Sequence, residues 1–89
     1  MNYKKYRIFL VTPGGQYVVS ASNTVNDLVD LTRAWLTTTT AGQYLPENVK
    51  GYLILQMLDE VTGAYMGGER VPFEDKDDII TQLRIIGGR

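Results

Sequence analysis

The residue types that most often perform chemistry in small proteins are missing from this chain. The sequence contains no cysteine and no histidine. Without cysteine there is no thiolate nucleophile, no disulfide and no sulfur-ligated zinc site. Without histidine there is no imidazole base, no Ser-His-Asp triad and no ordinary transition-metal site. We therefore expect a protein that is not itself an enzyme and holds no metal or other cofactor of its own.

Two kinds of motif could still indicate a ligand. The acidic run at residues 74–78 lacks the alternating ligands, central glycine and closing glutamate of a calcium loop. The glycine pairs at 14–15 and 67–68 are not followed by the Lys-Ser/Thr that opens the helix of a phosphate-binding loop. We interpret the acidic run as a solvated loop and both glycine pairs as turns.

Length and charge narrow the class of protein further. A chain of 89 residues makes one domain, and 44% apolar with 21% charged residues is ordinary globular composition. A net charge of −1 gives no electrostatic drive for non-specific binding to nucleic acid. The apolar run after the basic amino end is short and breaks at Pro13, which excludes a signal peptide or a membrane span there. We expect a cytoplasmic protein without membrane or nucleic-acid partners.

The first half of the chain predicts a β-hairpin followed by a helix. Residues 6–12 and 16–21 are rich in β-branched and aromatic side chains, and the Pro-Gly-Gly between them favours a sharp reversal. After Thr24, a suitable N-cap, apolar side chains recur at the spacing of one helix face. The helix should fray in the four threonines at 37–40 and end by Gly42.

The second half allows two architectures. Residues 52–58 predict a third strand, 59–63 a turn and 64–66 a short fourth strand. The β-branched content of residues 79–86 favours a last strand, which gives a ββ-α-ββ-β order. The apolar residues of that segment also fit a period of 3.6, and a helix over residues 75–86 gives ββα-ββα. The similarity of residues 6–10 to 52–56 supports this second order as an internal duplication.

Several segments, in order, resemble ubiquitin. The opening strand of ubiquitin is similar to residues 8–12, and the start of its helix is similar to residues 22–28. Its connection out of the helix resembles Gly42 with Leu45-Pro46-Glu47, and its third strand corresponds in position to residues 52–55. The resemblance implies an α+β, ubiquitin-like β-grasp fold: a mixed sheet of four to five strands on one main helix, with parallel first and last strands. It makes residues 79–86 a strand, residues 1–83 the domain and residues 84–89 a flexible tail.

The carboxyl end of the chain indicates which reaction the resemblance implies. The chain ends in Gly87-Gly88-Arg89, and the family consists of protein modifiers that react through a terminal glycine carboxylate. The resemblance implies that an E1-type activating enzyme uses ATP to adenylate Gly88 and that an E2-type transfer enzyme delivers it to a target protein. Gly87 lacks a Cβ, which suits the narrow sites of such enzymes. Because Arg89 follows Gly88, a processing peptidase must first remove it.

The resemblance also suggests where partners bind. Strand alternation turns Leu53 and Leu55 toward the helix and leaves Ile54 on the outer face, where it would join Ile80 in a small apolar patch like that of ubiquitin. Arg84 matches an arginine that ubiquitin also carries near its end, and Ile85 and Ile86 adjoin it. We expect these residues to contact partner proteins: Ile54, Ile80, Arg84, Ile85 and Ile86.

Two other classes fit the same sequence. Sulfur carriers of the thiamine and molybdopterin pathways also end in Gly-Gly, and they hold a thiocarboxylate there. A β-grasp binding module whose carboxyl end has no chemistry is the other alternative. The distance from ubiquitin itself suggests a bacterial operon that encodes modifier enzymes, some of which are linked to antiphage defence.

Overall fold

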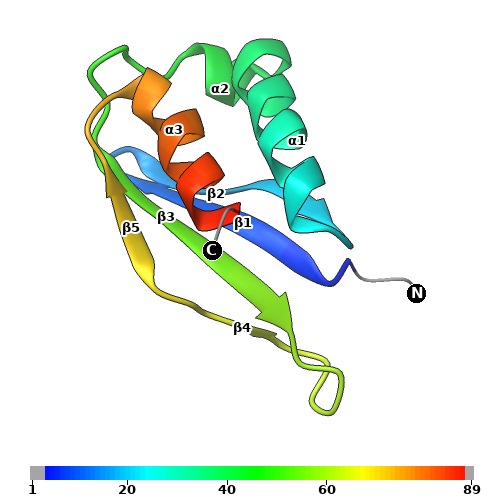
Figure 1. Cartoon of the computed structure of the whole chain (residues 1–89). Coiled ribbons are helices and arrows are strands. Elements are labelled where there is room, and N and C mark those ends of the chain that lie inside the picture. Colours follow the sequence, from blue (N-terminus) through cyan, green and yellow to red (C-terminus); the bar gives the residue numbers. More distant parts are fainter. Residues whose placement is uncertain (1–3, 88–89) are drawn as a thin grey trace.

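The structure is a computed structural model that describes residues 4–87. It is an α+β fold, as predicted, in which a five-stranded sheet packs against helices (Figure 1). The elements in chain order are β1 (Tyr6–Thr12), β2 (Gly15–Ser22), α1 (Val25–Thr38), α2 (Thr40–Gln43), β3 (Gly51–Leu58), β4 (Tyr65–Met66), β5 (Arg70–Phe73) and α3 (Lys76–Gly87).

The sheet is antiparallel throughout the described chain. Its strand order is β2-β1-β3-β4, and β5 pairs with β3 alongside β4. Both pairings of β1, with β2 and with β3, are antiparallel, and so are both remaining pairings of β3. The predicted mixed sheet, with parallel first and last strands, is therefore wrong. The two long hairpins meet instead through β1 and β3 at the centre of the sheet.

The segment predicted as the last strand, residues 79–86, is part of a helix, so this prediction is wrong. Ile79 and Leu83, four residues apart, are both buried in the core, so a helix hides them on one face. At the start of α3 the Asp78 amide donates a hydrogen bond to the Asp75 carboxylate, which satisfies one of the free amides of the first turn. Burial of this face outweighs the small strand preference of the isoleucines, because propensity differences are fractions of a kcal/mol per residue.

The helix α3 also replaces most of the predicted tail. Residues 84–87 form its last turn, and the rest of the 84–89 segment, Gly88 and Arg89, lies outside the described residues. The order of elements is thus the ββα-ββα alternative, with β4 as a short addition after β3. The predicted single main helix has a counterpart of similar length in the second half.

The other elements lie close to their predicted positions. The hairpin over β1 and β2 is confirmed, α1 begins at Val25 as predicted, and β3 differs from the predicted strand by one residue. The helix breaks at Thr39, whose side chain accepts a hydrogen bond from the Gly42 amide and so caps the short α2. Strand β5, which contains Pro72, was not predicted, since proline is unusual in a strand interior.

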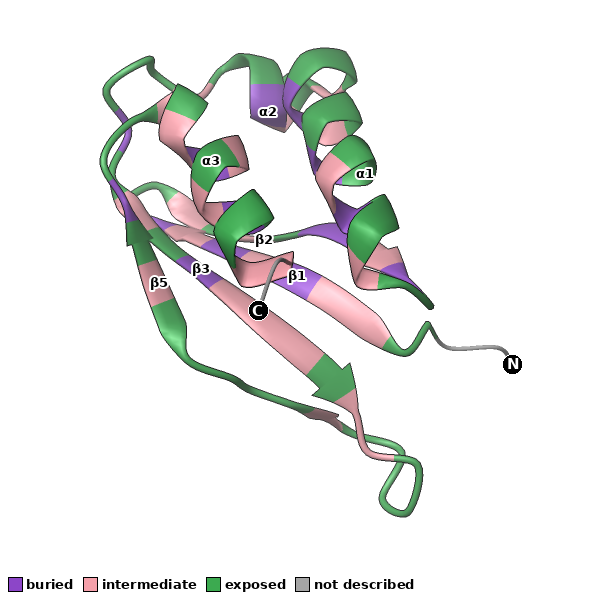
Figure 2. Cartoon of the chain, viewed as in Figure 1, coloured by how far each residue is buried: buried purple, intermediate pink, exposed green. Residues whose placement is uncertain are grey.

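All the helices lie on one face of the sheet (Figure 1). α1 packs over β2 and β1, α3 packs over β5 and β3, and the two helices contact each other. The residues between these layers are the buried ones in Figure 2. The hydrophobic core consists of Ile8, Leu10, Val19, Leu28, Leu36, Val49, Leu53, Phe73, Ile79 and Leu83.

Candidate interaction surface

The predicted patch of Ile54 and Ile80 does not form. Ile54 projects from the face of β3 opposite to Leu53, which is fully buried beneath the helices. Ile80 belongs to α3 and packs partly against the core from the helix layer, where it lines a cavity with Leu36 of α1. The sheet therefore separates the two side chains, although the predicted outward orientation of Ile54 itself is confirmed.

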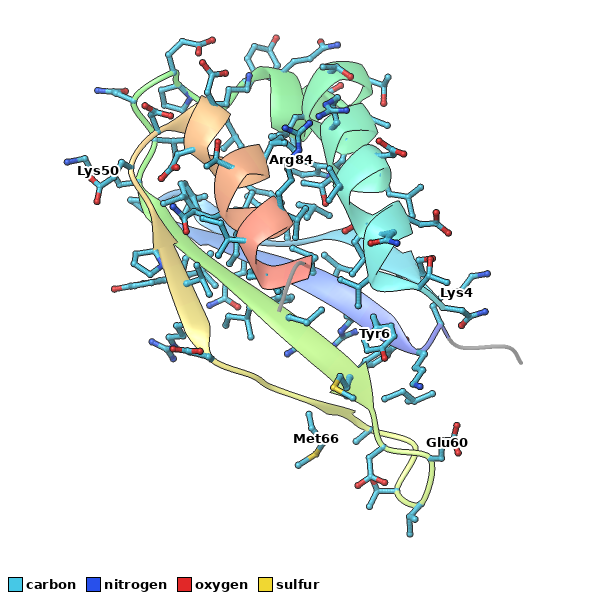
Figure 3. All side chains as sticks on the ribbon, viewed as in Figure 1. Lys4, Tyr6, Lys50, Glu60, Met66 and Arg84 are labelled. Atoms are coloured by element: carbon cyan, nitrogen blue, oxygen red, sulfur yellow. The ribbon has the colours of Figure 1, made fainter. Side chains whose placement is uncertain are left out.

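The remaining predicted partner-binding residues lie on one helical turn. Arg84 lines the same cavity as Arg33 of α1, and Figure 3 shows its side chain beside that helix. Ile85 is exposed and Ile86 packs partly against the core. A Cβ added at Gly87 would lie 3.3 Å from a methyl carbon of Val25, so the backbone at the end of α3 runs close to the start of α1.

The other face of the sheet has no covering layer in the described chain. Strand alternation and register assign its side chains, because residues paired across antiparallel strands project to the same side. Phe9 of β1 lies between Val18 of β2 and Ile54 of β3, and Val11 pairs with Tyr52 in the next row. We call this surface the open face; its outward strand residues are Arg7, Phe9, Val11, Gln16, Val18, Ala21, Tyr52, Ile54, Gln56, Leu58, Tyr65, Arg70 and Pro72.

The open face is apolar at its centre and accessible to a partner. Val18 is 46% exposed and Tyr52 is 43% exposed, which are high values for an aliphatic and an aromatic side chain on strands. Phe9 and Ile54 between them are partly buried by their neighbours. A contiguous exposed apolar surface of this kind marks a site of protein contact more often than scattered single residues do.

Two arginines hold fixed positions on the open face. The Arg7 guanidinium lies 4.0 Å from the ring centroid of Tyr65, and its Nε donates a hydrogen bond to the Gln56 side chain. The Arg70 guanidinium lies 5.7 Å from the ring centroid of Tyr52. Both distances are within the range of cation–π attraction. These contacts restrict the rotation of both side chains while their planar groups stay at the surface.

No carboxylate accompanies these arginines on the strands. Arg7 and Arg70 are the only charged residues in the five described strands, whose sequences contain no aspartate or glutamate. The ten acidic residues of the chain all lie in helices and connecting segments. The charged side chains of the described strands are therefore all positive, although the chain has a net charge of −1.

A cavity opens where the open face meets the turn of the first hairpin. It has a volume of about 460 Å³ and its walls include Val11, Pro13, Tyr52 and Pro72. At its rim Lys50 forms an exposed ion pair with Glu74, with 3.8 Å between nitrogen and oxygen. Apolar walls with a polar rim suit an apolar side chain of a partner that lies across the sheet.

The sequence predicted the outward orientation of Ile54 on one strand, but not the open face that this strand forms with its neighbours. Alternation along residues 52–58 was enough to place Ile54 outside, and the same alternation applies to Tyr52 and Gln56. The stacking of Arg7 on Tyr65 and of Arg70 on Tyr52 depends on which strands are neighbours. Because β5 was not predicted and the pairing of β1 with β3 was not known, neither contact could be anticipated.

Comparisons with known proteins give no match. A scan against protein families finds none, and searches of curated proteins and of solved structures find none. Within residues 4–87, no helix has the length and apolar character needed to cross a membrane. The same part of the chain has no group of three or more acidic side chains placed to hold a metal ion.

Proposed function

We propose that this chain is a non-catalytic interaction module that binds a partner protein through the open face of its sheet. One observation carries the proposal: the helices cover a single face, and the other presents Phe9, Val18, Tyr52 and Ile54 without a covering layer in the described chain. Each apolar side chain that a partner buries there gains about 25 cal/mol per Å² removed from water. This is the non-conjugated binding module among the classes that the sequence allows.

The test compares two substitutions of matched exposure. Val18 on the open face and Leu31 on α1 are 46% and 42% exposed, so a change of either to aspartate spares the core. The tagged full chain and both variants are isolated from native cells, and bound partners are measured by size-exclusion chromatography and mass spectrometry. Val18→Asp should abolish partner binding while Leu31→Asp retains it. Equal binding by both variants, or no partner in any sample, contradicts the proposal.

A ubiquitin-like modifier is the second candidate, and the terminal Gly87-Gly88-Arg89 favours it. In this proposal a peptidase removes Arg89, and activating and transfer enzymes join the Gly88 carboxylate to a target. The β1-β2 hairpin with α1 packed across it is the part of the fold that fits a β-grasp. Because α3 extends to Gly87, the last helical turn would have to unwind to give these enzymes an extended segment.

Intact mass from native cells separates the remaining classes. A modifier should lose Arg89 and form larger covalent adducts, and deletion of Gly87 and Gly88 should remove those adducts. A sulfur carrier should instead gain about 16 Da from exchange of one oxygen for sulfur. Adducts that persist after the deletion would contradict the modifier proposal, and an unaltered mass would contradict both.

A further inference from the structure

We infer that the open face accepts an acidic, apolar segment of a partner protein, with carboxylates that pair with Arg7 and Arg70. This inference rests on the proposed function of that face and adds the chemistry of the partner. It starts from the segregation of charge: the strands carry two arginines and no acidic residue. A partner with carboxylates would complement this surface, whereas a basic partner would be repelled.

The stacking of each arginine prepares it for such a ligand. A guanidinium that lies over an aromatic ring uses its face for the ring and keeps the N–H groups of its edge available for hydrogen bonds. For Arg7, the hydrogen bond to Gln56 is donated by Nε, which leaves the Nη groups to donate to an acceptor on the partner. Since the tyrosine rings already restrict both side chains, a carboxylate that binds them costs less side-chain entropy than one that binds a freely rotating arginine.

Register sets the spacing that the segment must match. Arg7 pairs with Gln56 on β3, while Arg70 on β5 pairs with Ile54, one row further along the same strand. Arg7 and Arg70 are separated by two inter-strand spacings across the sheet and by two residues along the strands, so their Cα atoms lie about 12 Å apart. The apolar residue Ile54 lies on β3, between the strands that carry the two arginines, and Phe9 lies beside it on β1. An extended segment spans that distance with carboxylates four residues apart, which places both on the side that faces the sheet, and with an apolar side chain between them.

A second copy of the chain fits this face less well. Two open faces packed against each other would bring four arginines together without any carboxylate from the strands, which is unfavourable when the charges lose water. Single-stranded nucleic acid would also be attracted to arginine and aromatic rings. Two cations on one face of a chain with net charge −1 provide little of the phosphate neutralisation that such binding needs. We therefore assign the face to an acidic peptide segment.

The experiment is a selection of random 12-residue peptides displayed on phage against the immobilised full chain. Selected peptides are synthesised, and their affinities are measured by fluorescence anisotropy for the parent chain and for two double variants. R7Q/R70Q removes the cations of the open face. R33Q/R84Q changes the net charge by the same amount on the helix layer.

The expected result is enrichment of peptides that combine aspartate or glutamate with apolar residues. Their affinity should fall roughly tenfold to hundredfold in R7Q/R70Q, the effect expected when charge-assisted hydrogen bonds are lost, and change little in R33Q/R84Q. Thermal unfolding of each variant checks the fold. If R7Q/R70Q is unstable, R70Q alone serves, because Arg70 is exposed and is the first residue of the short β5.

The other outcomes overturn the inference in distinguishable ways. Peptides that lose binding in Val18→Asp but are not acidic would leave the proposed function standing and show that the partner chemistry is wrong. The absence of any peptide that depends on Val18 would contradict both. A 12-nucleotide oligouridine probe is measured in parallel. If it binds the parent chain and R7Q/R70Q weakens it, while no acidic peptide binds, the face is a nucleic-acid platform.

Discussion

At the scale of single residues, Ser20 and Thr32 place two hydroxyl groups inside the core. Ser20 lies on β2 and Thr32 on α1, and their side-chain oxygens are 2.8 Å apart in a buried hydrogen bond. Thr32 is fully buried and Ser20 is 7% exposed. Because each hydroxyl satisfies the other, this contact fixes the position of α1 over β2 without leaving an unpaired polar group.

Thr32→Val should destabilise the protein by about 1–3 kcal/mol, because the Ser20 hydroxyl loses its buried partner. Ser20→Ala should have a similar effect for the same reason. The double variant S20A/T32V should cost clearly less than the sum of the two, since no hydroxyl then remains unpaired. Urea unfolding of the four proteins measures these free energies. Strict additivity would mean that the two hydroxyls do not interact.

A glycine on α2 permits another close contact. A Cβ at Gly42 would lie 2.2 Å from the Trp35 carbonyl oxygen and 2.7 Å from the Leu36 Cα, both on the backbone of α1. Gly42→Ala should therefore destabilise the protein by about 1–3 kcal/mol, since α2 must move away from α1. Gly67→Ala is the control, as nothing lies within 4 Å of its Cβ position. Thermal unfolding should show a lower midpoint for Gly42→Ala and a smaller shift for Gly67→Ala.

At the scale of elements, α3 can be distinguished from a strand by two alanine substitutions. In a strand, Leu83 and Ile85 would share one face, whereas in α3 Leu83 is 1% exposed and Ile85 is 48% exposed. Leu83→Ala should lower the free energy of unfolding by about 2–5 kcal/mol, and Ile85→Ala by less than about 1 kcal/mol. Chemical denaturation measures both. Similar losses at the two positions would indicate strand alternation and contradict the helix.

The sequence was informative where local signals agreed with one another. For β1, β2 and β3, side-chain type, alternation and flanking turns all favour a strand. For α1, the N-cap at Thr24 and the 3.6-residue period both favour a helix. Residues 79–86 gave conflicting signals, since isoleucine favours strands while its spacing fits a helix face. The packing of Ile79 and Leu83 between α1 and the sheet decided that conflict, and no local signal reports it.

The candidate site depended on contacts between distant segments. The outward position of Ile54 follows from strand alternation, but its neighbours Phe9 and Arg70 follow from strand pairing. The resemblance to ubiquitin placed the last segment beside β1 as a parallel strand. In the structure β3 lies next to β1, and the last segment is α3 on the face of the sheet opposite to Ile54, so the predicted patch with Ile80 does not form.

At the scale of the whole molecule, the chain consists of two halves that share one sheet. Each half has a hairpin followed by a helix, and they join where residues 6–11 of β1 pair with residues 52–57 of β3. Without the second half of the chain, β1 would lack its pairing with β3 and α1 would lack its contact with α3. Each half-chain is also close to the lower limit of roughly 40 residues below which a domain seldom buries a sufficient core unaided.

We therefore expect fragments 1–49 and 50–89 to be unfolded separately and to fold when mixed. Circular dichroism and the fluorescence of Trp35 measure the result; in the full chain the ring centroids of Trp35 and Tyr17, both in the first fragment, are 5.3 Å apart. An equimolar mixture should regain the far-ultraviolet spectrum of the full chain. Cooperative thermal unfolding of either fragment alone would contradict the expectation and make that half an independent unit.

The central pairing of β1 with β3 also has a kinetic consequence. Each hairpin closes a short loop, which takes microseconds, but this pairing must close a loop that contains β2, α1 and α2. Proteins rich in such non-local contacts fold more slowly than those with local ones, because the chain pays loop-closure entropy before the contacts form. The joining of the two hairpins is therefore the step expected to set the folding rate, and until it occurs β1 and β3 each expose an edge to other chains.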